Sequence, residues 1–445
     1  MTVLDQAFAR GDKIIVHDPK GEFVEAYFAD GTAVLLGPWD ARSAIWSTSD
    51  IDSPALVDEF TAMLCDVANS GHNRSFHTGA AVVLSALIKG LMRKFESWTW
   101  AQLGDALDEE TEAMIERAAE ADSSVRQTIP SVFSEIKKGM SPGEGAIISI
   151  LATSSRMLRQ LAAVDVARPE ALRFSLRRWL MGCEHKNVQL VVLNNSAEYP
   201  QAAEALFGAA LTVARATVVS RMPDVPADGP GVWMIMDEAP QLGAGGLAKV
   251  QTIAEVGRSR GIRVWQAAQS ESQFAAKMGS EQAAPLLSTQ NLRIYLRTGP
   301  GDADVVARRY GEREIQRQQS TASHGAIAGK VSPNERAPVL MPSDLSGLRV
   351  MPQGPEFLFA SSDLIGRLIQ PFPPRRPPMA VPYVECPSWR AGLSPRTVPE
   401  QGMASNDRAP QRQATAAKSL SSSEIPFDDE TPAAPASPDA LNWEG

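Results

Sequence analysis

The sequence predicts an α/β protein, a mostly parallel sheet with helices on both faces and an all-α insertion. Two observations support this fold. Short apolar runs alternate with helical segments over residues 188–360, and a long block, residues 54–166, has the spacing of successive helices. Alternation of strands and helices is typical of right-handed βαβ crossovers, which place parallel strands side by side. The 445 residues are enough to bury a core of this size.

The amino-terminal residues predict a short helix and two strands. Residues 2–10 carry apolar side chains at helical spacing, and a Gly-Asp pair ends this helix. Residues 13–17 are a compact apolar run, which predicts a buried strand with Asp18 at its carboxyl end. Residues 33–36 predict a second short strand.

The helical block begins near Pro54, a residue that suits the first turn of a helix. Thr99 is expected to cap a helix over residues 100–107. Other helical segments are expected over residues 76–95, 109–121 and 145–164. The segment 109–121 is acidic and is expected to be a solvated helix.

After the block, the alternating pattern predicts further strands separated by helices. The strands are expected at residues 188–193, 231–236, 262–268, 292–297 and 356–360, with helices over 201–219 and 246–258 among them. We therefore expect one α/β domain, formed by residues 1–47 and 171–370, with an all-α domain of residues 48–170 inserted.

The composition changes near Pro371. Several prolines form a stiff exit segment, and beyond Trp389 the chain is rich in Ser, Ala, Pro and Gln. Such a composition cannot bury enough apolar surface to fold alone, so residues 371–445 are expected to be a Pro-rich exit and a disordered acidic tail. A specific docking peptide is the alternative interpretation.

Bulk composition excludes several classes of protein. The net charge of −9 provides no global basic field, so any DNA contact has to come from local patches or from an assembled ring. The three cysteines and five histidines are dispersed and have no metal or disulfide spacing. No apolar run reaches the roughly 18 residues of a membrane helix, and no signal peptide is expected. As it stands, the chain is expected to be soluble and cytoplasmic.

The strongest local signal is an apolar strand that ends in Asp237 and Glu238. A buried parallel strand with two carboxylates at its carboxyl end resembles the Walker B element of nucleotide-hydrolysing motors. In that element the first carboxylate holds Mg²⁺, usually through water, and the second polarises the attacking water. Asp18 and Gln269 also follow strands, and α/β folds bind ligands at this edge of the sheet.

Two further residues have alternative interpretations. Gln269 follows the strand next to the carboxylate pair, where a glutamine can contact both the γ-phosphate and the attacking water. It can equally be an amide that caps a helix. Arg258 lies in the segment GRSRG, which suits the end of a helix or an arginine finger that reaches a nucleotide on a neighbouring subunit.

An ordered series of segments resembles the type IV coupling proteins, the TraD-like DNA-pumping ATPases of conjugation and type IV secretion. The segments are RGDKIIVHDPKGEF (10–23), DARS (40–43), SLRRWL (175–180), MDE (236–238), GRSRG (257–261), QS (269–270) and MPSDL (341–345). Together with the helical insertion, the resemblance spans roughly residues 3–360.

The resemblance implies a RecA-like nucleotide-binding domain that uses ATP and Mg²⁺. It implies a homo-hexamer at the cytoplasmic face of the inner membrane, which moves single-stranded DNA and its attached relaxase to the type IV secretion channel. Carried over residue by residue, Asp237 is the Mg²⁺ carboxylate, Glu238 the catalytic base, Gln269 the γ-phosphate sensor and Arg258 the trans-acting arginine. Asp18 matches a family motif at the cofactor site.

The chain departs from the family pattern in one respect. Its 445 residues contain no G-x-x-x-x-G-K-[ST] loop, the Walker A element that holds the phosphates. By the resemblance, this loop is expected just upstream of Met1, so the chain is expected to be truncated just after it. We therefore expect weak or no ATP binding unless the loop is supplied.

Two other functions remain open at this stage. One is a DNA- or relaxosome-binding adaptor without enzymatic activity, and the other is a related hexameric DNA pump for segregation or packaging. DNA contacts are candidates at four basic residues, either facing a ring pore or lying on a solvated helix face. These are Arg308, Arg309, Arg313 and Arg317.

Overall fold

The computed structural model describes most of the chain up to residue 392. The described ranges are 3–66, 71–134, 139–226, 229–315, 318–323, 326–331, 335–361, 364–372 and 377–392, with backbone alone for residues 315, 318–323, 326–331 and 335. All of them belong to one compact unit, Met1–Arg396. The predicted tail beyond residue 392 and Arg317 lie outside the described residues.

The centre of the fold is a five-stranded parallel sheet in the order β2-β5-β1-β6-β7. The strands are β1 (Lys13–Asp18), β2 (Ala33–Leu35), β5 (Leu190–Asn194), β6 (Val232–Met236) and β7 (Ile262–Gln266). This confirms the predicted parallel sheet. The central strand β1 pairs with β5 on one edge and β6 on the other, and β5 is buried throughout. Continuous apolar runs form such strands because both faces of the sheet are covered.

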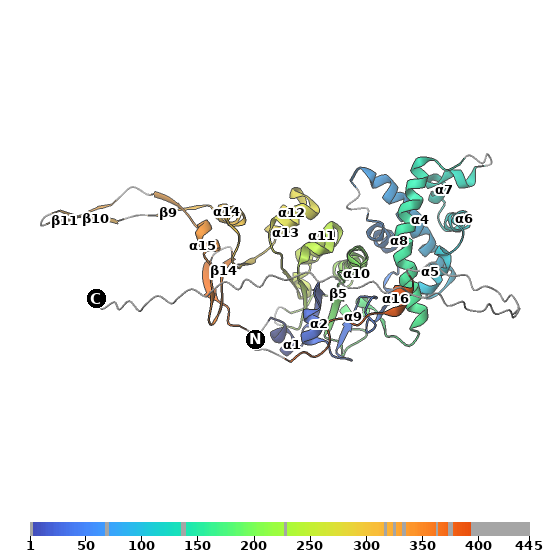
Figure 1. Cartoon of the computed structure of the whole chain (residues 1–445), viewed down its shortest axis with the longest axis horizontal. Helices are drawn as coiled ribbons and strands as arrows, with labels where there is room; N and C mark the ends of the chain where they lie inside the picture. The colour runs from blue at the N-terminus through green and yellow to red at the C-terminus, as the bar shows by residue number, and fades with distance from the viewer. Residues whose placement is uncertain are drawn as a thin grey trace, which may run out of the picture. The chain divides into compact units, whose positions relative to one another are not determined.

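Helices cover the two faces of this sheet (Figure 1). On one face α1 (Val3–Ala9) and α2 (Glu22–Tyr27) pack over alternate side chains of the strands, among them Ile14, Val16 and Ile235. On the other face α10 (Pro200–Ser220) and α11 (Gly243–Val256) pack over the intervening side chains. The period of two along each strand separates these two sets.

The predicted helical block is present. It contains α3 (Pro54–Leu64), α4 (Arg74–Lys94), α5 (Trp100–Leu107), α6 (Thr111–Ala121), α7 (Ser124–Thr128) and α8 (Pro142–Ala167). Thr99 forms the expected cap on α5, as a capping box with Gln102. The acidic helix α6 has a solvated face as predicted, but its opposite face buries Met114 and Ile115 against the block.

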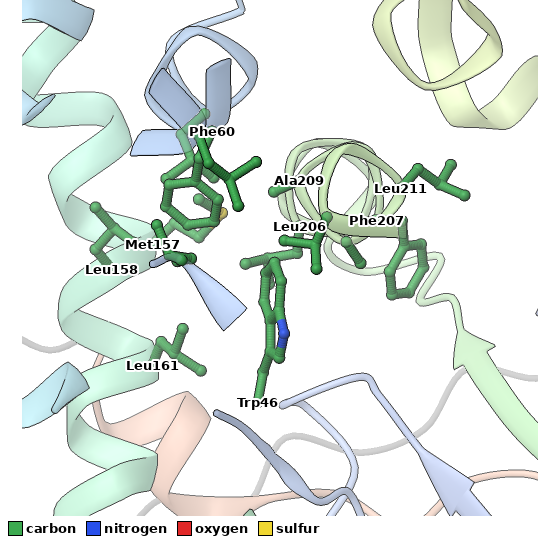
Figure 2. Close-up of a cluster of buried hydrophobic side chains, with 14 of the residues drawn as sticks. Trp46, Phe60, Met157, Leu158, Leu161, Leu206, Phe207, Ala209 and Leu211 are labelled. Atoms are coloured by element: carbon green, nitrogen blue, oxygen red, sulfur yellow. The ribbon is translucent and has the colours of Figure 1, made fainter. Parts of the chain in front are cut away.

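The helical block and the sheet share one hydrophobic core. Trp46 lies between α8 and α10, with Met157, Leu161 and Leu206 around it (Figure 2). The chain enters and leaves the block through two short parallel strands that pair with each other, β3 (Ile45–Trp46) and β4 (Arg173–Phe174), and α9 (Leu176–Leu180) follows.

Two helical segments are long and apolar enough to cross a membrane, Gly71–Lys94 and Pro200–Ser220. Their most apolar windows are 56% and 67% buried inside the protein, as expected of core helices. Length and composition are therefore weak evidence for a membrane span here.

A second, antiparallel sheet contains the last two predicted strands. Here β14 (Gly354–Ser361) pairs with β8 (Leu292–Tyr295), β13 (Val350–Met351) and β15 (Ile365–Ile369). The sequence predicted both strands but not their separation from the parallel sheet. The difference arises because the choice of strand partner depends on contacts between distant segments, which the local apolar pattern does not contain.

The remaining elements surround this second sheet. They are α12 (Ser272–Met278), α13 (Ser280–Ser288), α14 (Pro300–Arg309), α15 (Pro342–Ser346), the ladder of β9 (Glu312–Ile315) with β12 (Glu335–Pro338), and the ladder of β10 (Gln318–Ser323) with β11 (Ala326–Val331). Helices α14 and α15 cover one face of the sheet around Tyr295 and Leu358.

Residues 377–392, which we call the C-terminal strap, return to the parallel sheet and the helical block. The strap ends in α16 (Pro387–Ala391), whose Trp389 is buried against Trp39. The main chain of the strap donates to Trp39 O from Cys386, and Trp389 O accepts a hydrogen bond from Gln160 on α8. The strap thus bridges the sheet and the helical block.

Candidate functional site

Three strand ends meet at the carboxyl edge of the parallel sheet. Because β1, β6 and β7 are adjacent and parallel, the residues that follow them lie close together. Asp18 ends β1, Asp237 and Glu238 follow β6, and Gln269 follows β7. The structure therefore brings together four of the predicted site residues.

Glu238 is the centre of this group. Its backbone is in the left-handed region, with φ 46° and ψ 51°, at the turn between β6 and α11. Its carboxylate is 3.2 Å from Nζ of Lys20 and accepts hydrogen bonds from Nε2 of Gln241 at 2.5 Å and Nε2 of Gln269 at 3.5 Å. Sequence reasoning had assigned no role to Lys20 or Gln241. The sequence signal for Lys20 was its place in the family segment of residues 10–23, directly after the predicted strand that ends at Asp18.

The surroundings of Glu238 keep its carboxylate charged. Partial burial alone raises the pKa of Glu238, but the hydrogen bonds and charge of Lys20, with the two glutamine amides, outweigh it and lower the pKa below its usual value. The same contact raises the pKa of Lys20. Asn195 supports the arrangement by donating to Oε1 of Gln241 at 2.9 Å.

Asp237 has the opposite electrostatic environment. Burial and the neighbouring charge of Glu238 raise the pKa of Asp237 above its usual value. Its main-chain carbonyl accepts a hydrogen bond of 2.6 Å from Nδ1 of His17, the residue before Asp18 on β1. Burial lowers the pKa of His17, so the imidazole is neutral and its tautomer is fixed by this bond. The backbone of the carboxylate pair is therefore tied to the central strand.

The carboxylate of Asp18 accepts hydrogen bonds from main-chain groups of its own chain. Its two carboxylate oxygens accept main-chain N–H groups of four residues at the start of α2: Lys20, Gly21, Phe23 and Val24. Burial raises the pKa of Asp18, and these four hydrogen bonds oppose that rise. Its predicted contact with a nucleotide stays a prediction. What the structure shows is that Asp18 fixes the loop that carries Lys20.

Arg258 lies on the other edge of the sheet. It begins the short 3₁₀ turn Arg258–Arg260, which follows α11 and precedes β7, and it is exposed. Since α11 runs antiparallel to the strands, this turn is at their amino edge, away from Asp237 and Glu238. Within one chain Arg258 therefore does not join the site, and an arginine-finger role requires contact across subunits.

The four basic residues predicted to contact DNA are in different situations. Arg308 is exposed on α14, with Nε bonded to the carbonyl of Asp304 one turn earlier. Arg309 forms an ion pair with Glu271. Arg313 is exposed on β9, and Arg317 lies outside the described residues.

A polar network links the end of β7 to the second sheet. Oγ of Ser270 donates to Oδ1 of Asp302 on α14 at 2.9 Å, and Oη of Tyr295 on β8 donates to Oε1 of Glu271 at 3.2 Å. Arg309 pairs with the same glutamate. The residues directly after Gln269 are therefore in contact with the helix that carries Arg308.

This geometry defines a class of protein: an α/β domain with a five-stranded parallel sheet, a carboxylate pair at the end of one of its strands and an inserted helical block. Over residues 1–354 the sequence matches the family described as "Type IV secretion-system coupling protein DNA-binding domain". The chain belongs to this family, and the family predicted from its motifs is confirmed.

A curated relative and two solved structures show how far the similarity extends. Coupling protein TraD of Escherichia coli (strain K12) is 24% identical over 323 residues, which are 71% of this chain and 42% of TraD. The chain thus spans less than half the length of that relative. The bacterial conjugative coupling protein TrwBdeltaN70, in an unbound form, has a TM-score of 0.68 at 18% identity, covering 86% of this chain and 83% of TrwBdeltaN70. TrwB in complex with ADP and Mg²⁺ has a TM-score of 0.65 at 19% identity, covering 86% and 83%.

The carboxylates fit Mg²⁺, and the N–H groups that follow β1 are already bonded within the chain. Carboxylate oxygens are the ligands Mg²⁺ prefers, and burial, followed by the charge of Glu238, raises the pKa of Asp237, so that a bound cation would favour its charged form. No group of three or more His, Cys, Asp or Glu side chains within the described residues is placed to hold a metal. Mg²⁺ is commonly bound by one or two carboxylates together with water and phosphate oxygens. Among the described residues, the N–H groups at the start of α2 are bonded to Asp18 and are not available to a phosphate.

Proposed function

We propose that this chain is the motor component of a coupling protein, which uses ATP to move single-stranded DNA and its attached relaxase to a type IV secretion channel. The proposal rests on family membership and on one observation, the convergence of Glu238 and Gln269 at the carboxyl edge beside Asp237. TrwB, which has this fold, has been solved with ADP and Mg²⁺. In the proposed assembly, a homo-hexamer acts at the cytoplasmic face of the inner membrane.

Each residue of the group has a separate task in this proposal. Asp237 holds Mg²⁺ through water, and the ion neutralises phosphate charge when bound. Glu238 accepts a proton from the attacking water, and Gln269 orients that water beside the γ-phosphate. Arg258, on the amino edge of the sheet, reaches the nucleotide of a neighbouring subunit. Arg308 and Arg313 contact DNA through charge, independently of sequence.

The 445 residues lack the G-x-x-x-x-G-K-[ST] sequence, and we propose that they bind ATP weakly without it. Backbone amides of such a loop supply most contacts to the phosphates, and its lysine neutralises them. Calorimetric titration of the chain with Mg-ATP is therefore expected to show no tight binding. Micromolar affinity in this chain alone contradicts the proposal.

The catalytic assignment is tested in a form of the chain extended with the phosphate-binding loop ahead of Met1. DNA-stimulated ATP hydrolysis is expected to fall about 100-fold or more in Glu238→Gln, which keeps the size of the side chain and one acceptor oxygen but removes the base and the ion pair with Lys20. The matched control is Glu255→Gln on the exposed face of α11, whose carboxylate is bonded to Gln251 on its own helix. Equal activity in the Glu238→Gln variant removes Glu238 from its assigned role.

A second candidate function is a DNA- or relaxosome-binding adaptor without hydrolysis. The observation that favours it is the occupation of the N–H groups at the start of α2 by Asp18, which leaves this loop unavailable to a phosphate. An adaptor binds DNA with the same affinity whether or not nucleotide is present. The motor instead predicts DNA affinity that changes with nucleotide once the loop is supplied.

A further inference from the structure

The C-terminal strap lies in a groove whose walls come from distant parts of the chain. Residues 21–25 and 39–42 line its first part, and α8 and Tyr199 line the part that holds α16 (Figure 1). Hydrogen bonds to main-chain groups of the strap hold it there. Among them, bonds of 2.7–2.8 Å run from Met379 N to Glu25 O, from Arg42 Nη1 to Val381 O, from Ala41 N to Val384 O and from Cys386 N to Trp39 O. Main-chain bonds hold an extended segment whatever its side chains are.

Two side chains of the strap fit the groove by shape. A Cβ placed on Gly21 would lie 2.7 Å from Cβ of Pro382, so the groove has room for this proline because residue 21 is glycine. Trp389 is 1% exposed, and its ring centroid lies 5.6 Å from that of Trp39 and 5.9 Å from that of Tyr199. Main-chain bonds that give affinity and pockets that select side chains are the two parts of a peptide-binding site.

The contacts of the strap do not require that the strap and the groove belong to the same copy of the chain. The residues that line the groove lie far from the strap in the sequence, and every copy has the same groove and the same strap. The sequence that leads from the second sheet to the strap, residues 371–378, contains five prolines. Pro-rich sequences favour a stiff, extended backbone, and short hinges under strain favour the exchange of an identical element between copies.

We propose that the groove of one copy of this chain binds the C-terminal strap of a second copy in place of its own. An exchanged strap forms the same hydrogen bonds and the same ring contacts, which makes such an exchange a low-cost route to assembly. The groove includes Gly21, the neighbour of Lys20, so the exchanged strap reaches the sheet edge that carries Glu238 in the next copy. This interaction goes beyond the proposed function and needs neither nucleotide nor DNA.

The first test asks whether the groove binds a strap that is not covalently attached. A fluorescent peptide of residues 377–392 is titrated with the 445-residue Trp389→Ala chain, whose own strap has lost its anchor. We expect this variant to bind the peptide at least about tenfold more tightly than the wild-type chain does, because the attached wild-type strap competes at a high effective concentration. The same peptide with Trp389→Ala is the matched control and is expected not to bind. Equal binding of the two peptides overturns the peptide-binding groove.

A second variant is used in case the loss of Trp389 unfolds the chain. A Cβ placed on Gly392 would lie 3.0 Å from Cα of Gln160 and 3.3 Å from Cβ of Ala163, so Gly392→Leu obstructs the end of the strap without removing a buried ring. Circular dichroism shows whether each variant is folded. Folded Gly392→Leu is expected to bind the peptide as folded Trp389→Ala does. A folded variant that does not bind the peptide overturns the proposal.

The second test asks whether the strap of a second copy is the occupant. One chain, Gly392→Leu, has a free groove. The other, Ala163→Arg, has a blocked groove and a free strap, since Ala163 on α8 faces Gly392. We expect immobilised Gly392→Leu to bind Ala163→Arg at least about tenfold more tightly than it binds the chain with both substitutions, which differs from Ala163→Arg only in its strap. Surface plasmon resonance measures both affinities.

Equal affinities in the second test overturn the exchange between copies. Binding of the peptide together with equal affinities also overturns it, because the groove then serves another segment. Neither test contains nucleotide or DNA. A failure of these tests therefore leaves the proposed function standing, and a failure of ATP hydrolysis in the loop-extended chain leaves the exchange of straps standing.

Discussion

Lys20 and Glu238 follow different strands and form an ion pair at the carboxyl edge of the sheet, with 3.2 Å between Nζ and Oε1. The lysine side chain is 60% exposed and the glutamate side chain 20% exposed. The pair therefore places a mobile, solvated cation on the proposed catalytic base.

Removal of this cation is expected to change the proton affinity of the base. In Lys20→Met the pKa of Glu238 rises, because the partner that favours its charged form is lost. In the loop-extended chain, the acid limb of the pH–rate profile for ATP hydrolysis shifts to higher pH. Lys186→Met, an exposed lysine ahead of β5, is the control and leaves the profile in place. An unmoved acid limb in Lys20→Met contradicts the assignment of Glu238 as the base.

The left-handed backbone of Glu238 predicts an unusual order of stability among variants. A residue with a side chain in this conformation costs roughly 1 kcal/mol relative to glycine. Glu238→Gly is therefore expected to be about 1 kcal/mol more stable than Glu238→Ala, although both lose the same carboxylate. Urea unfolding of the two variants measures the difference. An alanine variant as stable as the glycine variant means that the turn is unstrained.

His17 makes stability depend on pH. Burial lowers the pKa of His17 in the folded protein, so folding favours the neutral ring. The stabilisation is fully present above the unfolded pKa of 6.5 and is lost as pH falls below that value and through the lowered pKa of the folded protein. His17→Gln keeps a donor for the carbonyl of Asp237 and removes the titration. Between about pH 7.5 and about pH 5.5, the wild-type chain is expected to lose more unfolding free energy than the variant, by at most about 1.4 kcal/mol per pH unit. If the unfolding free energies of the wild-type chain and of His17→Gln change with pH in parallel, His17 does not cause the pH dependence of stability.

The C-terminal strap is expected to depend on one aromatic anchor. Trp389 is 1% exposed and lies against Trp39 and Tyr199, so Trp389→Ala should cost about 3–5 kcal/mol of stability. Limited proteolysis should then cut within residues 377–392 faster than in the wild-type chain. Arg390→Ala, on the exposed side of the same helix, is the control and leaves both measurements unchanged. A strap that resists cleavage in Trp389→Ala is anchored by other contacts.

Substitutions of two neighbouring arginines are expected to distinguish an effect on DNA binding from an effect on stability. Arg308 is exposed, whereas Arg309 is bound to Glu271. Arg308→Ala is expected to weaken single-stranded DNA binding without changing stability, and to reduce the salt dependence of log K by about 0.7 per lost phosphate contact. Arg309→Ala is expected to lower stability as well. Fluorescence anisotropy at several salt concentrations measures the first effect. If the salt dependence of log K is unchanged in Arg308→Ala, Arg308 does not contact the DNA phosphates.

Much of the fold followed from local sequence. Apolar runs long enough for one strand located β1, β5, β6 and β7, and the Thr99 cap located the start of α5. These features depend on residues close in sequence, which is why periodicity finds them. The antiparallel pairing of β8 with β14 did not follow, because partner choice depends on contacts between distant segments.

The candidate site was predictable in part for the same reason. Asp237, Glu238 and Gln269 follow recognisable strands, so their common edge could be expected. The ion pair with Lys20 depends on β1 lying next to β6, a neighbour relation that the order of elements along the chain does not reveal. The burial of Trp389 was equally hidden, since it lies in a Pro-rich segment and its partners Trp39 and Gln160 are more than two hundred residues away.

The core around Trp46 determines how the helical block is connected to the sheet. The helical block is joined to the sheet by packed side chains on α8 and α10 and by the paired strands β3 and β4. Helix α10 begins at Pro200, just after the loop whose Asn195 bonds Gln241 beside Glu238. The helical block is therefore connected to the sheet through the packed helix α10 and not only through the chain segments that join the two. Through α10 and the loop before it, the block is connected to the turn that carries Glu238.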